Sequence, residues 1–127
     1  FIEADILFYE FDSDNPSGLF LRVSEDSSYH EQVHIGHRGY FLGFDGNDMF
    51  IWRMNFGKKE LWRQRCLLLP WKEYCIRMEI YGGSIAVWVD GECLVTVTEN
   101  GPFPYGRAGV GSFGARTLVK RVQYELR

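Results

Sequence analysis

The stretch that decides the fold is WKEYCIRMEIYGGSIAVWVDGECLVTVT, residues 71–98, in which apolar and polar side chains alternate. Gly82-Gly83 interrupts the alternation once, and Asp90-Gly91 interrupts it again. Alternation with a period of two is typical of half-buried strands, and such dipeptides connect antiparallel strands in tight turns. The stretch therefore predicts three consecutive antiparallel strands.

The two faces of the first predicted hairpin carry different side chains. With a turn at the paired glycines, Arg77 lies opposite Trp88, and Glu79 shares their face. The other face is apolar and is expected to form core: Ile76, Met78, Ile80, Ile85, Val87 and Val89. We also expect Trp71, at the head of the stretch, to be buried in the core.

Similar alternation recurs along the rest of the chain. Strands are expected over Phe1–Phe11, Gly18–Val23, Tyr29–Ile35, Gly39–Phe44, Met49–Asn55, Arg107–Phe113 and Leu118–Leu126. The apolar sets expected to face the core are Ile2, Ala4, Ile6 and Phe8, then Leu19, Leu21 and Val23, then Phe50, Trp52 and Met54. No stretch has the apolar spacing of a long helix. The pattern predicts an all-β fold, a two-sheet antiparallel jelly-roll sandwich.

Length and charge limit the choice of function. The chain has 127 residues, the size of one domain, so we assign a single β-sandwich domain to residues 1–127. Since the strand pattern begins at Phe1 itself, we interpret this domain as one excised from a larger protein.

Basic residues cluster in Arg53–Arg65, but the net charge of −3 argues against nucleic-acid binding. No apolar stretch approaches the roughly 20 residues that span a bilayer, so no membrane span is expected.

Several short motifs follow one another in the second half of the chain. They read Trp71-x-x-Tyr74-x-Ile76-x-Met78-x-Ile80, then Gly82-Gly83, then Ile85-x-Val87-x-Val89-Asp90-Gly91. This series resembles the concanavalin A-like lectin/glucanase superfamily, and Gly106-x-x-Gly109-Val110-Gly111 with the closing strand Val119–Leu126 is similar to its last hairpin. The chain most resembles the carbohydrate-binding modules and the domains named for 3-keto-disaccharide hydrolysis. The resemblance implies this sandwich fold and an oligo- or polysaccharide partner.

The cysteines leave the cellular compartment open. Cys66, Cys75 and Cys93 are too few for a disulfide scaffold and too sparse for a zinc site. We expect no bridge between Cys75 and Cys93, because they fall at different levels of neighbouring predicted strands. The odd count favours a reducing compartment, whereas the family resemblance favours an extracellular or cell-surface location.

The acidic motif of the superfamily's glucanases is incomplete here. Those enzymes carry Glu-x-Asp-x-x-Glu on one strand, and retaining hydrolysis needs two carboxyl groups roughly 5 Å apart. The nearest match is Glu3-Ala4-Asp5-Ile6-Leu7-Phe8, in which Phe8 stands at the third carboxylate position. We therefore expect no enzyme and interpret Glu3 and Asp5 as a solvated strand face.

Sugar binding calls for an exposed aromatic ring beside hydrogen-bonding groups. Trp88 with Arg77 and Glu79 is the first candidate, because the predicted hairpin places all three outside the core. In the alternative interpretation, a loop or a neighbouring domain covers Trp88.

A second candidate is Trp62 with Arg63, which marks either a ligand groove or a protein interface. Tyr105 is a candidate for the rim of a groove, and His34 lies on a polar strand face with His30. The two histidines, at positions i and i+4 of a strand, are about 13 Å apart and cannot ligate one metal. Asp45-Gly46-Asn47-Asp48 carries oxygen ligands that suit calcium, although a tight hairpin turn explains the same residues. No cofactor is expected, and a structural calcium ion stays open.

Two main functions follow from these observations. The leading hypothesis is a non-catalytic, lectin-like module that holds glycan on an exposed sheet face. The alternative is a structural or protein-interaction sandwich whose exposed aromatic residues contact a neighbouring domain of the same chain. A glycoside-cleaving enzyme comes third because the acidic motif is missing.

Overall fold

The computed structural model describes residues 1–11, 16–24, 37–99, 101, 103, 106–112 and 116–125. In these ranges the chain forms ten strands and no helix. The strands are β1 (Ile2–Phe8), β2 (Ser17–Val23), β3 (Arg38–Phe44), β4 (Asp48–Asn55), β5 (Lys58–Arg65), β6 (Glu73–Tyr81), β7 (Ser84–Val89), β8 (Glu92–Thr98), β9 (Arg107–Ser112) and β10 (Thr117–Tyr124). Nothing in the described part of the chain is a helix long and apolar enough to cross a lipid bilayer.

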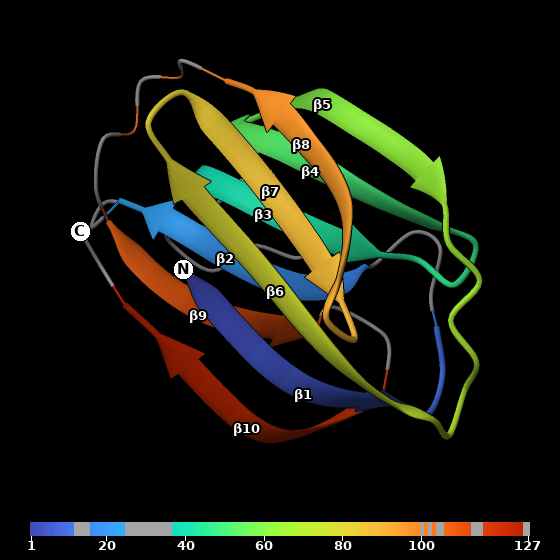
Figure 1. Cartoon of the computed structure of the whole chain (residues 1–127). Helices are drawn as coiled ribbons and strands as arrows, with labels where there is room; N and C mark the ends of the chain where they lie inside the picture. Colours follow the sequence, from blue (N-terminus) through green and yellow to red (C-terminus); the bar gives the residue numbers. More distant parts are fainter. Residues whose placement is uncertain are drawn as a thin grey trace.

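The strands form two five-stranded sheets that pack face to face (Figure 1). Sheet A has the strand order β10-β1-β6-β7-β8, and sheet B has the order β5-β4-β3-β2-β9. Neighbours such as β1 and β6 are far apart in sequence, so the chain passes from one sheet to the other, as in jelly-roll sandwiches. The prediction of an all-β, two-sheet antiparallel sandwich is confirmed.

The core lies between the two sheets and consists of alternate residues of their strands. The even positions of β1 are buried as predicted, with Ile2, Ala4, Ile6 and Phe8 at most 1% exposed. The β6–β7 hairpin has the predicted register, with Met78 opposite Val87 and Arg77 opposite Trp88. Period-two alternation therefore separates a core face from an outer face in sheet A.

Sheet B buries apolar side chains on its outer face as well. A second cluster, distinct from the core between the sheets, contains Phe20, Phe41, Phe50, Trp52 and Met54, each at most 6% exposed. Two cations lie over its rings, because Lys58 Nζ is 4.0 Å from the centre of the Trp52 ring and Arg63 Cζ is 4.6 Å from that of Phe50. The predicted burial of Phe50, Trp52 and Met54 is confirmed, but they pack outside sheet B, whereas Met49 and Ile51 face the core between the sheets.

One prediction about strand pairing was wrong, and one strand was not predicted. The closing strands do not form a hairpin, because β9 pairs with β2 in sheet B and β10 pairs with β1 in sheet A. In addition, Lys58–Arg65 within the basic run forms the edge strand β5, which the sequence did not predict.

Two predictions about burial were also wrong. Val23 packs against the outer cluster rather than with Leu19 and Leu21, because Arg22 has a φ of 54° and the register shifts there. Trp71 is 71% exposed and precedes β6 instead of opening it.

The three cysteines are free, so the predicted absence of a bridge between Cys75 and Cys93 agrees with the structure. Cys75 and Cys93 lie on β6 and β8, which are separated by β7 rather than being neighbours. The predicted strand Tyr29–Ile35 lies outside the described residues.

Candidate functional site

Arg77, Glu79 and Trp88 lie together on the outer face of sheet A, as the hairpin register predicts. Arg77 Cζ is 5.8 Å from the centre of the Trp88 ring and 3.8 Å from that of Phe1. Arg77 Nη2 is 3.3 Å from Glu79 Oε2, and Arg77 Nη1 is 3.9 Å from Glu3 Oε1. The guanidinium group therefore links two aromatic rings and two carboxylates, and Trp88 is only partly exposed.

A second arginine organises the acidic residues of β1. Arg121 on β10 donates from Nε to Asp5 Oδ2 at 2.7 Å and from Nη2 to Glu3 Oε2 at 3.0 Å. The hydrogen bond from Arg121 lowers the pKa of Asp5. Glu3 and Asp5 lie partly exposed on the outer face as expected, and both are paired with Arg121. Phe8, at the third position of the incomplete motif, is fully buried in the core.

A shallow hollow opens beside this face, between the two sheets. It lies at the end of the sandwich where β1 begins and β2, β6 and β10 finish, on the left in Figure 1. Its lining residues are Phe1, Leu21, Arg22, Glu79, Ile80, Tyr81, Gly106 and Glu125. Tyr81 is 70% exposed, so the hollow combines an open aromatic ring with carboxylate and guanidinium groups. That combination suits the C–H faces and hydroxyl groups of a sugar.

Arg22 enters the hollow from a strained part of β2. Its φ of 54° is unfavourable for a residue with a side chain. A Cβ added at Gly106 would lie 2.5 Å from the carbonyl carbon of Arg22, and one added at Gly39 would lie 2.8 Å from its carbonyl oxygen. The two glycines thus allow neighbouring backbone to approach Arg22 closely. The Arg22 side chain is held as well, because its Nη1 donates to the Phe103 carbonyl at 3.2 Å. Strain that the surroundings enforce in this way is concentrated at functional sites in proteins.

A polar cluster lies next to Leu21 on the inner face of sheet B. Tyr40 lies opposite Leu21 in sheet B, and Arg53 Nη1 is 2.9 and 3.0 Å from the two carboxylate oxygens of Glu99. Burial and the nearby Glu99 carboxylate raise the pKa of Tyr40 to about 12. The tyrosine therefore stays neutral at physiological pH, beside an ion pair that fixes the segment after β8.

Two other predicted site residues, Trp62 and Arg63, do not line the hollow. Trp62 is partly buried against the core between the sheets, whereas Arg63 lies over the outer cluster, so the two residues occupy opposite faces of β5. Tyr105 and His34 lie outside the described residues.

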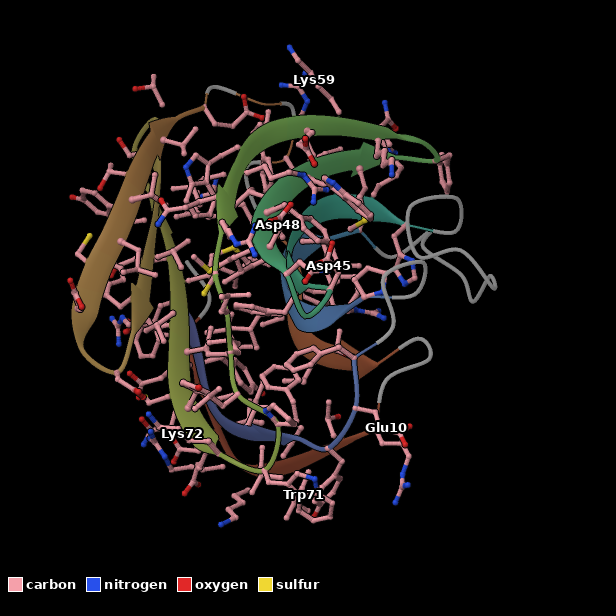
Figure 2. The ribbon with its side chains drawn as sticks, turned by 90° about the vertical axis from the view of Figure 1, so that its right-hand side faces the viewer. Glu10, Asp45, Asp48, Lys59, Trp71 and Lys72 are labelled. Carbon is pink, nitrogen blue, oxygen red and sulfur yellow. The ribbon has the colours of Figure 1, made fainter. Side chains whose placement is uncertain are left out.

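The β3–β4 turn, which was the calcium candidate, is held together by protein groups. Asp45 Oδ1 accepts hydrogen bonds from the backbone N–H groups of Asn47 at 3.0 Å and Asp48 at 2.8 Å, which confirms the predicted turn (Figure 2). Arg63 Nη1 is 2.9 Å from Asp48 Oδ2 and 3.5 Å from Asp45 Oδ2. Within the part of the chain that the structure describes, no group of three or more histidine, cysteine, aspartate or glutamate side chains could hold a metal ion.

Sequence reasoning missed Arg22, Tyr81 and Glu125 as site residues. Tyr81 had a usable signal, because the outward alternation of Arg77 and Glu79 continues to it just before the glycine turn. Arg22 and Glu125 had none, since the hollow joins segments that are distant along the chain.

Comparisons with known proteins bear on the fold. No family model and no curated protein matches the chain. Among solved structures, the chain is similar to the carbohydrate binding module CBM66 from Bacillus subtilis, with a TM-score of 0.77 and 15% sequence identity. The likeness covers 95% of this chain and 71% of that one. At this identity it shows a shared β-sandwich fold.

Proposed function

We propose that the chain is a non-catalytic carbohydrate-binding module of the concanavalin A-like kind, with its sugar site at the hollow. The observation that carries the proposal is the exposed Tyr81 ring beside Arg22, Glu79 and Glu125 in one hollow. The fold shared with a carbohydrate-binding module supports it. An oligo- or polysaccharide is the proposed partner.

Each part of the hollow has a role in this proposal. The C–H face of a sugar ring stacks on Tyr81, and the apolar side chains of Phe1 and Ile80 line the hollow beside it. Sugar hydroxyl groups donate to the carboxylates of Glu79 and Glu125 and accept from the Arg22 guanidinium group. Charge-assisted hydrogen bonds of this kind are stronger than neutral ones and fix the orientation of a ligand.

The Arg77–Trp88 pair then acts as a support rather than as the stacking platform. Arg77 is already engaged by the rings of Phe1 and Trp88 and by the carboxylate of Glu79. Because both Phe1 and Glu79 line the hollow, this cluster holds two of its walls in place.

The proposed function does not include hydrolysis of the bound sugar. A retaining glycosidase needs two carboxyl groups roughly 5 Å apart with distinct protonation states. In the strand that matches the glucanase motif, Arg121 holds Asp5 as a carboxylate, and the third position is the buried Phe8.

A glycan array tests the proposal with four proteins: wild type, Tyr81→Ala, Trp88→Ala and Tyr124→Ala. Tyr124 is the matched control, since it is 62% exposed but does not line the hollow. Loss of the stacking ring in Tyr81→Ala should weaken binding by about tenfold or more, whereas Tyr124→Ala should bind like wild type. Trp88→Ala should have an intermediate effect, because it disturbs only the support.

Circular dichroism shows whether each variant is folded, and repeating the array with calcium and with a chelator tests for a metal requirement. Silence of the wild type across the array, together with no binding of oligosaccharides at millimolar concentration, would refute glycan binding. Equal losses in Tyr81→Ala and Tyr124→Ala would show that the hollow is not the site.

A further inference from the structure

Trp71 is displayed at the opposite end of the sandwich from the hollow. It is 71% exposed, and in Figure 2 it projects from the lower edge with Lys72 and Glu10 on either side. Its ring makes an edge contact with the Tyr9 ring, with centroids 4.6 Å apart and an interplanar angle of 61°. The two rings form an aromatic surface on the connections that flank β1 and β6.

The backbone holds this exposed ring in a strained conformation. Trp71 has a φ of 67°, which is rare for a bulky residue, and its N–H donates to the Phe8 carbonyl at 2.8 Å. This hydrogen bond to the end of β1 fixes the backbone position from which the indole ring projects. A ring positioned before binding loses little conformational entropy when a ligand arrives.

Hydrogen-bonding groups surround the two rings. Arg116 Nη1 is 3.7 Å from Glu10 Oε1, and their side chains are 69% and 60% exposed. Arg116 Cζ is also 5.8 Å from the centre of the Tyr9 ring. Sugar sites place hydrogen-bond donors and acceptors directly beside a stacking ring. Arg116 and Glu10 supply a donor and an acceptor beside the Tyr9 ring, so the surface suits a sugar.

We propose that Trp71 and Tyr9 form a second sugar-binding platform, separate from the hollow. This inference rests on the proposed function and extends it from one site to two. Trp71 precedes β6 and Tyr81 ends it, so at 3.2–3.4 Å per residue the two sites are roughly 30 Å apart. One sugar ring cannot reach both, and the domain binds either two parts of a long polysaccharide or two separate chains.

Fluorine NMR of the whole chain, with 5-fluorotryptophan at its four tryptophans, tests the platform directly. The Trp71 signal is assigned by its absence in Trp71→Phe. The probe is the oligosaccharide that binds best on the array or, if the array is silent, millimolar cellohexaose, xylohexaose and mannohexaose in turn. The Trp71 signal should shift on titration in wild type and equally in Tyr81→Ala.

The three outcomes separate the two proposals. A Trp71 shift that persists in Tyr81→Ala supports the second platform. Saturable binding without a Trp71 shift refutes the platform and leaves the hollow intact. No shift of any signal and no binding of any probe refutes both.

A second measurement uses the polysaccharide that contains the repeat of the binding oligosaccharide, immobilised at high density. Two linked sites bind such a surface more tightly than either site alone, so Trp71→Ala should bind it at least tenfold more weakly than wild type. Leu69→Ala is the matched control, because Leu69 is 59% exposed in the same connection and should change nothing. Equal binding by wild type and Trp71→Ala would contradict a second site.

Discussion

The two sheets differ in what they place on their outer faces. Sheet A presents partly exposed polar groups linked by Arg77 and Arg121, and the candidate hollow adjoins this face. Sheet B buries a second aromatic cluster, in which Phe41 is fully buried and the Phe50 and Trp52 rings stack 4.5 Å apart. The central strands β2, β3 and β4 of sheet B are therefore buried on both faces, whereas the charged face of sheet A remains available for polar recognition.

This difference is visible in the burial of individual strands. In β3 every residue after Arg38 is buried, so the strand reads as a continuous apolar run. In β1 buried and partly exposed residues alternate. Continuous runs are typical of strands covered on both faces, and alternation is typical of strands with one solvated face.

The largest expected effect is a difference in the free energy of unfolding between two variants, each of which lacks one aromatic ring on the outer face of a sheet. Phe41→Ala should lower the free energy of unfolding by about 3–5 kcal/mol, because it leaves a cavity among Phe20, Phe50 and Trp52. Trp88→Ala on sheet A should cost only about 1–2 kcal/mol, because that ring is partly exposed. Urea denaturation of both variants measures the difference.

Phe41→Leu keeps most of the volume and should cost less than Phe41→Ala, which shows that packing rather than aromaticity matters. If Trp88→Ala were as destabilising as Phe41→Ala, the outer faces of the two sheets would be equivalent in energy, contrary to the comparison.

The sequence predicted sheet A well because its strands obey a single rule. Alternation and glycine turns fix both the register and the face of each residue in β6 and β7. It missed β5, since an edge strand rich in charge packs only a few residues, such as Leu61 and Trp62, against the core.

The backbone explains the two errors in burial. Arg22 and Trp71 have positive φ values, a conformation that normally selects glycine, so neither residue type signals it. The kink at Arg22 turns Val23 to the other face, and the conformation of Trp71 turns its ring to solvent. The candidate hollow was missed for a related reason, because its residues come from five separate parts of the chain.

A smaller effect is expected at the charged edge of sheet B. Arg63→Gln should lower the free energy of unfolding by about 1 kcal/mol, because Asp48 and Glu60 lose their counter-ion and Phe50 loses the cation above its ring. Thermal unfolding at low and at high salt measures it, and screening should shrink the difference at high salt.

Lys59→Gln is the control for this strand. Its side chain is exposed (Figure 2), so its replacement should be nearly neutral. Calcium added to the wild type should not stabilise the β3–β4 turn, since Arg63 already pairs with both Asp45 and Asp48. A calcium-dependent rise in Tm that disappears in Asp45→Asn would show that the ion displaces Arg63.

The smallest effect concerns the polar face of sheet A and depends on pH. The hydrogen bond from Arg121 lowers the pKa of Asp5 in the folded chain, so folding favours its charged form. The resulting stabilisation is present above the pKa of about 3.9 that Asp has in an unfolded chain, and it is lost as pH falls through the lower folded value.

Arg121→Gln should therefore be less stable than wild type at neutral pH, and the two should converge in acid. Urea denaturation across the acidic range measures this, with Arg116→Gln as a control whose pair with Glu10 is more exposed. A difference between Arg121→Gln and wild type that stayed constant with pH would mean that Arg121 acts through packing of its stem, and the outer face of sheet A would then resemble that of sheet B more closely than its charges suggest.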